Sequence, residues 1–178
     1  MKLIWFGGTT IRIHIGGAIL VADAPLAPAG IDAAELVSGA DRVFGFAVSD
    51  ESLPAVDATV WKPRRAPRPL EDDSQVDVVV WRVGPGAVLV DALGEPPLLL
   101  VAGELPRLGR WMGDAVVVLF GDGAAMSGLG EALLDVAPPR LIGLAGSEED
   151  VDFAITALRE HLDGTGLVSL EARLALEI

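Results

Sequence analysis

Five carboxylate side chains follow predicted strands and could together bind a metal ion: Asp23, Asp50, Glu51, Glu104 and Asp122. A ligand set made only of oxygens suits Mg²⁺, Ca²⁺ or Mn²⁺ better than Zn²⁺. A hydrolase with such a carboxylate-only site is therefore one hypothesis. The alternative, that these residues form turns and keep the surface soluble, is favoured, because 26 of the 178 residues are acidic and several at strand ends are expected by chance.

Acid–base chemistry has few candidates in this chain. Glu104 comes first, because a carboxylate at the end of an apolar strand can have a raised pKa. Neither Glu104 nor Asp122 has an identified partner, so no catalytic residue is assigned. His14 alternates with isoleucines and should face away from the buried side of its strand, whereas His161 is expected in the last turn of a helix, where a cation is favourable.

The residue inventory excludes several kinds of site. With no cysteine and two histidines, the chain has no disulfide, thiolate nucleophile or zinc–cysteine site, and no resident cofactor is expected. Glycines at 121–123 and 128–130 flank the start of a predicted helix and could cradle a phosphate. They match neither the Walker nor the dinucleotide motif, so ordinary loop glycines are the better interpretation.

Length and composition predict one domain over residues 1–178. The chain is 51% hydrophobic, with a net charge of −13 and a pI near 4.4. Nucleic acids and anionic membranes are therefore excluded as general partners. A mean hydropathy of +0.48 is high for so short a chain and predicts self-association into a homo-oligomer that hides surplus apolar surface.

The N-terminal region lacks the pattern of a targeting signal. Arg12 and His14 interrupt the apolar run that a signal peptide requires. No stretch approaches the roughly 18 apolar residues of a membrane helix. We therefore expect a cytoplasmic protein with no membrane partner.

The first half, 1–60, is predicted to be rich in strands. Alternating isoleucines and a glycine pair indicate a hairpin, and Asp32 with Glu35 forms a capping signal for a short helix. The predicted elements are strands at 11–15, 18–22 and 42–48 and a helix from Asp32 to Gly39.

Residues 61–73 differ in composition and are predicted to be a loop, because three prolines exclude a helix interior or a central strand. The loop is first basic and then acidic. A solvated connection is the favoured interpretation, and an anion site made by Arg64, Arg65 and Arg68 is the alternative.

The second half, 74–178, repeats the strand-rich pattern and adds helices. Ser127 is expected to cap a helix that runs to about Val136, and Ser147 to cap another whose apolar stripe ends before Gly164. The predicted strands lie at 76–83, 87–91, 98–102, 115–120, 141–144 and 168–178. Residues 17–25 and 97–106 also resemble one another, which favours an α+β fold built as a duplicated β-sandwich with outer helices.

Three stretches of the first half resemble the start of a metallo-β-lactamase-fold protein, namely 1–10, 19–25 and 40–44. The most similar branch contains ascorbate-phosphate lactonase-like hydrolases, which begin W-L/F-G-H and continue with a glycine hairpin and a strand ending D-P. Residues 99–104 and 114–123 resemble later motifs of that branch, and the likeness extends over nearly the whole chain. The resemblance implies a four-layer αββα sandwich, trimmed to a single short domain.

The family's metal ligands are replaced in this sequence. Gly8 stands where the first motif ends in histidine, and the resemblance implies that the other vacated metal-site positions are Ala47, Ser49, Glu51, Ser52, Glu104 and Ala145. Asp23 matches the family and is there mainly structural. Hydrolysis in the family uses two metal ions held largely by imidazoles, which alanine and serine cannot replace.

The resemblance and the lost ligands together predict a catalytically inactive member of the family. We expect a binding or assembly module without metal-dependent hydrolysis, with a possible small-molecule ligand in the vacated cleft. The carboxylate-only hydrolase is the alternative.

Overall fold

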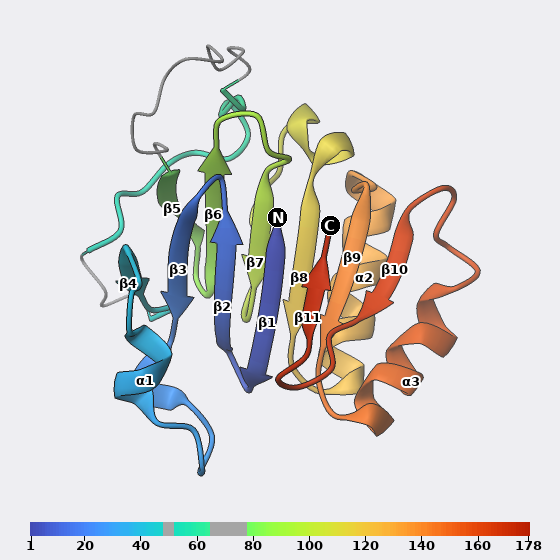
Figure 1. Cartoon of the computed structure of the whole chain (residues 1–178). Helices are drawn as coiled ribbons and strands as arrows, with labels where there is room; N and C mark the ends of the chain where they lie inside the picture. Colours follow the sequence, from blue (N-terminus) through green and yellow to red (C-terminus); the bar gives the residue numbers. More distant parts are fainter. Residues whose placement is uncertain (48–51, 65–77) are drawn as a thin grey trace.

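Two β-sheets stack face to face at the centre of the molecule, which a computed structural model describes over residues 1–47, 52–64 and 78–178 (Figure 1). The five-stranded sheet has the order β11 (Ala175–Glu177), β1 (Lys2–Gly7), β2 (Thr10–Ile15), β3 (Ala18–Ala22) and β4 (Arg42–Phe44). The six-stranded sheet has the order β10 (Gly166–Ser169), β9 (Leu141–Ala145), β8 (Val116–Phe120), β7 (Leu98–Val101), β6 (Ala87–Ala92) and β5 (Val78–Gly84). The described helices are α1 (Ala33–Val37), α2 (Gly123–Val136) and α3 (Glu148–Leu158), with short 3-10 turns at Ala24–Leu26 and Arg110–Asp114. The fold is therefore of the mixed α+β class.

The predicted hairpin in the first half is confirmed. Ile11, Ile13 and Ile15 are at most 1% exposed, because the period of two turns them all toward the second sheet. Gly16 and Gly17 both have positive φ, as a tight two-residue hairpin turn requires. The helix predicted after Asp32 is also confirmed, since the Asp32 carboxylate accepts a hydrogen bond from the Ala34 N–H.

β4 is shorter than predicted. It ends at Phe44, and residue 48, the last of the predicted strand, lies outside the described residues.

The six-stranded sheet begins antiparallel and becomes parallel. β5, β6 and β7 pair antiparallel, and β7 to β10 pair parallel. β3 and β7 occupy matching places, since each is antiparallel to the strand before it and parallel to the next one. The two stretches that resemble one another, 17–25 and 97–106, therefore contain strands with equivalent positions in the two sheets.

The single strand predicted at 168–178 is wrong. Its residues form β10 in one sheet and β11 in the other, separated by a turn in which Arg173 has a φ of 69°. The alternating pattern continues through both strands and so did not reveal the turn. The crossing brings the end of the chain beside its start, where the Ile178 N–H donates to the Met1 carbonyl (Figure 1).

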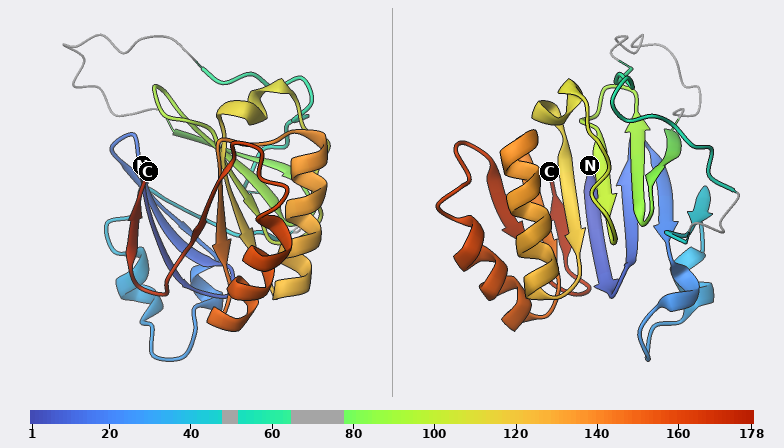
Figure 2. Two further views of the ribbon diagram at one scale, coloured as in Figure 1. Left: turned by 90° about the vertical axis from the view of Figure 1, so that its right-hand side faces the viewer. Right: turned by 180° about the vertical axis from the view of Figure 1, so that it is seen from behind.

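Helices α2 and α3 cover the outer face of the six-stranded sheet near β8 to β10 (Figure 2). They pack closely at Gly130, where a Cβ would lie only 2.6 Å from the Leu158 Cδ1 atom. Of the described helices, α1 lies on the outer face of the five-stranded sheet, where its Leu36 packs on Val21 and Ala24. In the described ranges, no helix combines the length and apolar character needed to cross a bilayer.

Two expectations about these helices need correction. Ser127 does not cap α2, because the helix already begins at Gly123 and the Asp122 carboxylate accepts from the Ala125 N–H. Ser127 lies one turn into α2, and its hydroxyl donates to the Gly123 carbonyl. The predicted cap at Ser147 is confirmed, but α3 ends at Leu158, so His161 lies in the following turn.

The segment 52–64 crosses the same outer face of the six-stranded sheet as α2 and α3, but on the side of β5. The Trp111 indole N–H donates to the Ala58 carbonyl at 2.7 Å, and the rings of Trp61 and Trp111 meet edge to face. Residues 61–64 form neither helix nor strand, as predicted for this part of the loop.

Arg64 anchors the end of this segment. Its Nε and Nη2 atoms donate to the Asp91 carboxylate at 2.6 Å and to the Asp91 carbonyl at 2.9 Å, and the Asp91 side chain is only 3% exposed. Arg64 therefore neutralises a buried carboxylate. Arg65 and Arg68, the other two residues of the anion site considered as an alternative, lie outside the described residues.

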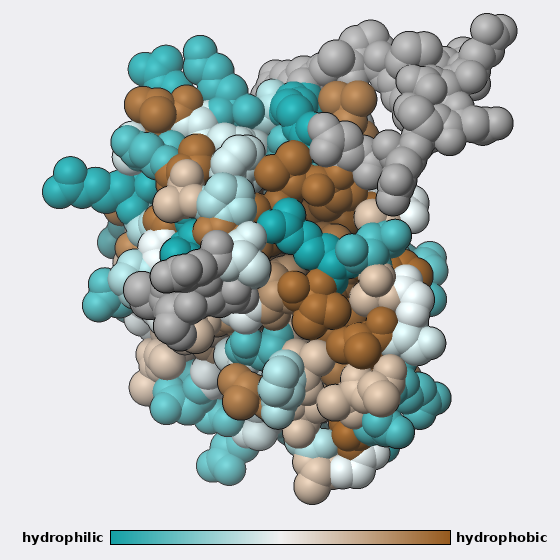
Figure 3. Space-filling view, turned by 90° about the vertical axis from the view of Figure 1, so that its left-hand side faces the viewer, coloured by the Kyte–Doolittle hydropathy of each residue, from teal (hydrophilic) through white to brown (hydrophobic). Residues whose placement is uncertain are grey.

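Apolar side chains also gather on the side of the molecule where β4 and β5 form the sheet edges, between the two grey segments in Figure 3. Val43 in β4 remains 45% exposed, and Val60 in the crossing segment is 71% exposed. This surface is more apolar than the charge of the chain suggests.

We predict that Arg64→Met lowers the free energy of unfolding by about 2–4 kcal/mol, because it leaves the buried Asp91 carboxylate without its cation. Urea denaturation measures the change. Lys62, an exposed cation of the same segment, supplies the control: Lys62→Met should change the free energy of unfolding by less than about 0.5 kcal/mol. The double variant Arg64→Met/Asp91→Leu should recover most of the loss, and a single variant as stable as the parent would contradict this role.

Candidate functional site

Several candidate residues directly follow a strand, and most of these strands end at one edge of the sandwich, the lower edge in Figure 1. β1, β3, β7, β8 and β9 all point toward that edge. Their C-terminal ends therefore place Gly8, Asp23, Glu104, Asp122 and Gly146 on the same side of the molecule.

Asp23 is buried at this edge and forms part of the backbone architecture. It is 8% exposed and has a left-handed backbone, with a φ of 47°. One carboxylate oxygen accepts from the Thr9 hydroxyl at 2.5 Å and the other from the Phe46 N–H at 3.2 Å. The Asp23 carbonyl also accepts from the Thr10 hydroxyl. Both carboxylate oxygens are thus used in holding neighbouring segments.

The other candidate carboxylates are not gathered around Asp23. Asp122 is exposed and caps α2, and Glu104 is exposed beyond β7. Asp50 and Glu51 lie outside the described residues. Among residues 1–47, 52–64 and 78–178, no group of three or more His, Cys, Asp or Glu side chains is placed to hold a metal ion.

The described residues at the metal-site positions that the resemblance implies do not share one environment. Ala145 is buried at the end of β9, whereas Ala47 is exposed. Ser52 is exposed, and its carbonyl accepts from Arg42. Ser49, like Glu51, lies outside the described residues.

His14 lies on the outer face of the five-stranded sheet, as the alternation predicts, and is half-buried there. Burial lowers its pKa, and the positive charges of Arg12 and Lys2 lower it further. Lys2 is its direct neighbour across β1 and β2. These charges favour the neutral imidazole.

The backbone N–H of Gly123, which was considered as part of a phosphate cradle and judged less favourable than a loop, donates to a side chain of the protein itself. The Gly123 N–H, at the start of α2, donates to the Asp150 carboxylate at 2.8 Å. The second oxygen of Asp150 accepts from the Ser147 hydroxyl at 2.5 Å. Asp150 therefore joins the first turns of both helices. The loop interpretation of the glycines fits Gly121, but it is wrong for Gly123, Gly128 and Gly130, which lie in α2.

A groove of about 600 Å³ opens beside α3 at the same edge. It lies between the start of α3, the end of β10 and the turn that leads to β11, and Trp5 of β1 contributes to its wall. The indole N–H of Trp5 donates to the carbonyl of Gly8 at 3.0 Å. The lining residues are Trp5, Gly146, Ser147, Glu148, Val151, Asp152, Ile155, Ser169, Leu170, Glu171 and Ala172.

The sequence did not indicate this groove. Val151 and Ile155 were assigned to the apolar stripe that packs α3 on the sheet, and both also line the groove. Leu170 and Glu171 were placed within a continuous strand, whereas they lie at the end of β10 and in the turn. Only the separation of β10 from β11 creates the hollow.

No protein-family model matches the chain, and no curated protein and no solved structure matches it.

We predict that Asp23→Ala lowers the free energy of unfolding by about 2–4 kcal/mol, because it leaves the Phe46 N–H unpaired and places alanine in a left-handed conformation. Thermal and urea unfolding measure the loss. Asp23→Asn keeps an acceptor and tolerates the backbone angle, so it should cost less. Equal stability of all three proteins would contradict a structural role for Asp23.

A second prediction concerns pH. The Ser147 hydroxyl, followed by the Gly123 N–H, holds the pKa of Asp150 below its ordinary value. The ionised carboxylate therefore stabilises the fold above the unfolded pKa of about 4, and this contribution is lost as the pH falls through the lower folded value.

The difference in Tm between the parent and Asp150→Asn should be largest near neutral pH and should shrink below about pH 4. Asp135→Asn removes an equivalent charge from an exposed site on α2 and serves as the control. A constant difference between parent and Asp150→Asn across this pH range would refute the assignment.

Proposed function

We propose that the chain is a metallo-β-lactamase-like αββα protein that binds a ligand in the groove beside α3 and does not perform metal-dependent hydrolysis. The stacked sheets with helices on their outer faces and the convergence of strand ends support this fold. The structural role that the resemblance implies for Asp23 is consistent with its contacts, since its carboxylate accepts from the Thr9 hydroxyl and the Phe46 N–H.

The observation that carries the proposal is the groove itself. Its volume of about 600 Å³ is typical of small-molecule sites, which span about 300–1,000 Å³. It adjoins Gly146, next to Ala145, where the family's late histidine would stand. Its position next to Ala145 supports the proposal that the ligand uses space beside one of the replaced positions.

Self-association is the second part of the proposal. Val43 in β4, Val60 in the segment 52–64 and Phe153 on α3, which is 58% exposed, leave apolar surface that a second copy would cover. We further propose a cytoplasmic location. Because the net charge is −13, we also propose that neither nucleic acid nor an anionic membrane is a partner.

Groove binding is tested by NMR with uncharged fragments such as phenethyl alcohol. A compound that enters the groove should shift the indole N–H signal of Trp5, which is assigned with Trp5→Phe. Ala172→Trp blocks the groove from an exposed position and should abolish the shift, whereas Ala132→Trp on α2 should leave it unchanged.

Metal analysis of protein purified without added metal completes the test. Zinc, manganese or iron bound in stoichiometric amount would overturn the proposal. If neither an uncharged nor a charged fragment reaches the groove, the proposed binding site is wrong.

A further inference from the structure

The groove beside α3 combines an apolar floor with a negatively charged rim. Trp5, Val151, Ile155 and Leu170 provide the apolar walls. Of these, Trp5, Val151 and Leu170 are each at most 8% exposed, so they are held in place by the core behind them. A ligand with an apolar body would therefore displace water from a preformed surface.

All charged residues that line the groove are acidic. Glu148 and Asp152 come from one side, on α3, and Glu171 comes from the opposite side, in the turn after β10. No lysine, arginine or histidine is among the described lining residues. A carboxylate or phosphate ligand would be repelled from this rim, and a cation would be attracted.

The positive groups nearby do not reverse this charge. The start of α3 carries a partial positive charge, but its first turn contains Glu148, Glu149 and Asp150. The Asp150 N–H is already paired with the Ser147 hydroxyl oxygen. Arg173 belongs to the same turn as Glu171, yet it does not line the groove, and its backbone N–H donates to the Trp5 carbonyl.

We propose that this groove binds an organic cation, an ammonium group carried on an apolar body, with the ammonium between Glu171 and the carboxylates of α3. The inference rests on the proposed binding function and adds the chemical class of the ligand. The proposed ligand is a small molecule with one positively charged end. It is small enough to fit in the groove of about 600 Å³.

Three probes with the same phenyl body test the charge preference: phenethylammonium, phenethyl alcohol and phenylpropionate, titrated at neutral pH and low salt while the Trp5 indole signal is followed by NMR. The cation should bind at least about tenfold more tightly than the anion, with the alcohol between them, and added salt should weaken the cation only. Ala172→Trp should abolish the response to every probe.

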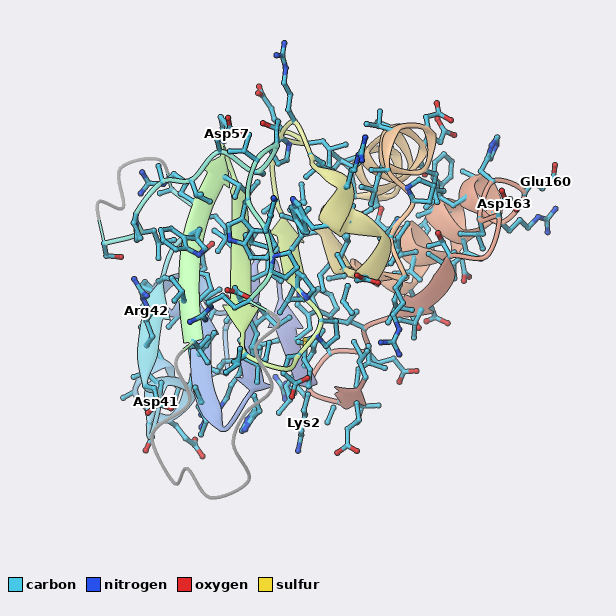
Figure 4. The ribbon with its side chains drawn as sticks, turned by 90° about the horizontal axis from the view of Figure 1, so that it is seen from above. Lys2, Asp41, Arg42, Asp57, Glu160 and Asp163 are labelled. Atoms are coloured by element: carbon cyan, nitrogen blue, oxygen red, sulfur yellow. The ribbon has the colours of Figure 1, made fainter. Side chains whose placement is uncertain are left out.

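The triple variant Glu148→Gln/Asp152→Asn/Glu171→Gln should lose most of the preference for the cation while binding the alcohol within about twofold of the parent. Its control removes the same net charge elsewhere, in Glu131→Gln/Glu160→Gln/Asp163→Asn. Glu160 and Asp163 lie beyond α3 and point outward in Figure 4, and Glu131 is exposed on α2. Unfolding curves establish that both variants remain folded.

The outcomes separate the two proposals. If the alcohol reaches the groove but the anion binds as well as the cation, or the control variant loses the preference equally, the ligand class is wrong and the binding function stands. If Ala172→Trp leaves the shift of the Trp5 signal unchanged for all three probes, or if no probe shifts that signal, both proposals fail.

Discussion

The carboxylate of Asp23 holds together the chain segments that meet where β3 ends. Its two oxygens accept hydrogen bonds from Thr9, before β2, and from Phe46, after β4, over sequence separations of 14 and 23 residues. Phe46 in turn packs edge to face on Phe44 and on Phe120 of the other sheet. A buried carboxylate is stable here because nearby donors replace the water that it loses.

Asp150 performs a similar task at the same edge of the second sheet. It accepts from Gly123 at the start of α2 and from Ser147 at the start of α3, and so joins the loops that follow β8 and β9. Asp122 adds a cap to α2. Acidic residues at strand ends therefore serve as acceptors for the free N–H groups of turns and helix starts, which is a sufficient reason for their presence.

The groove beside α3 is a consequence of how the chain changes sheets. β10 pairs with β9 in one sheet and β11 pairs with β1 in the other, so the intervening turn must cross the edge of the sandwich. Trp5, the start of α3 and this turn surround a space that the core does not fill. Because the rim residues come from α3 and from the turn, the charge of the groove depends on two segments that pack only in the folded chain.

Much of the fold could be predicted from local pattern. Alternation at 11–15, the glycine pair at 16–17 and the cap at Ser147 each depend on residues within one turn or one strand, and all three match the structure. The sequence analysis missed the cap of α2 for two reasons. Asp122 stands between two glycines, which are typical of a loop, and Ser127 is itself a common capping residue. The division of 168–178 was missed because a strand shows the same alternation in either sheet.

By itself, the sequence determined the α+β character, the positions of most strands and the acidic surface, since these follow from composition and from spacing along the chain. Only the tertiary structure decided that Asp23 and Asp150 bind backbone groups, that Arg64 neutralises Asp91 and that a groove opens beside α3. Each of those features joins residues that are distant in sequence, and their distances are set by how the two sheets stack and where the chain crosses between them.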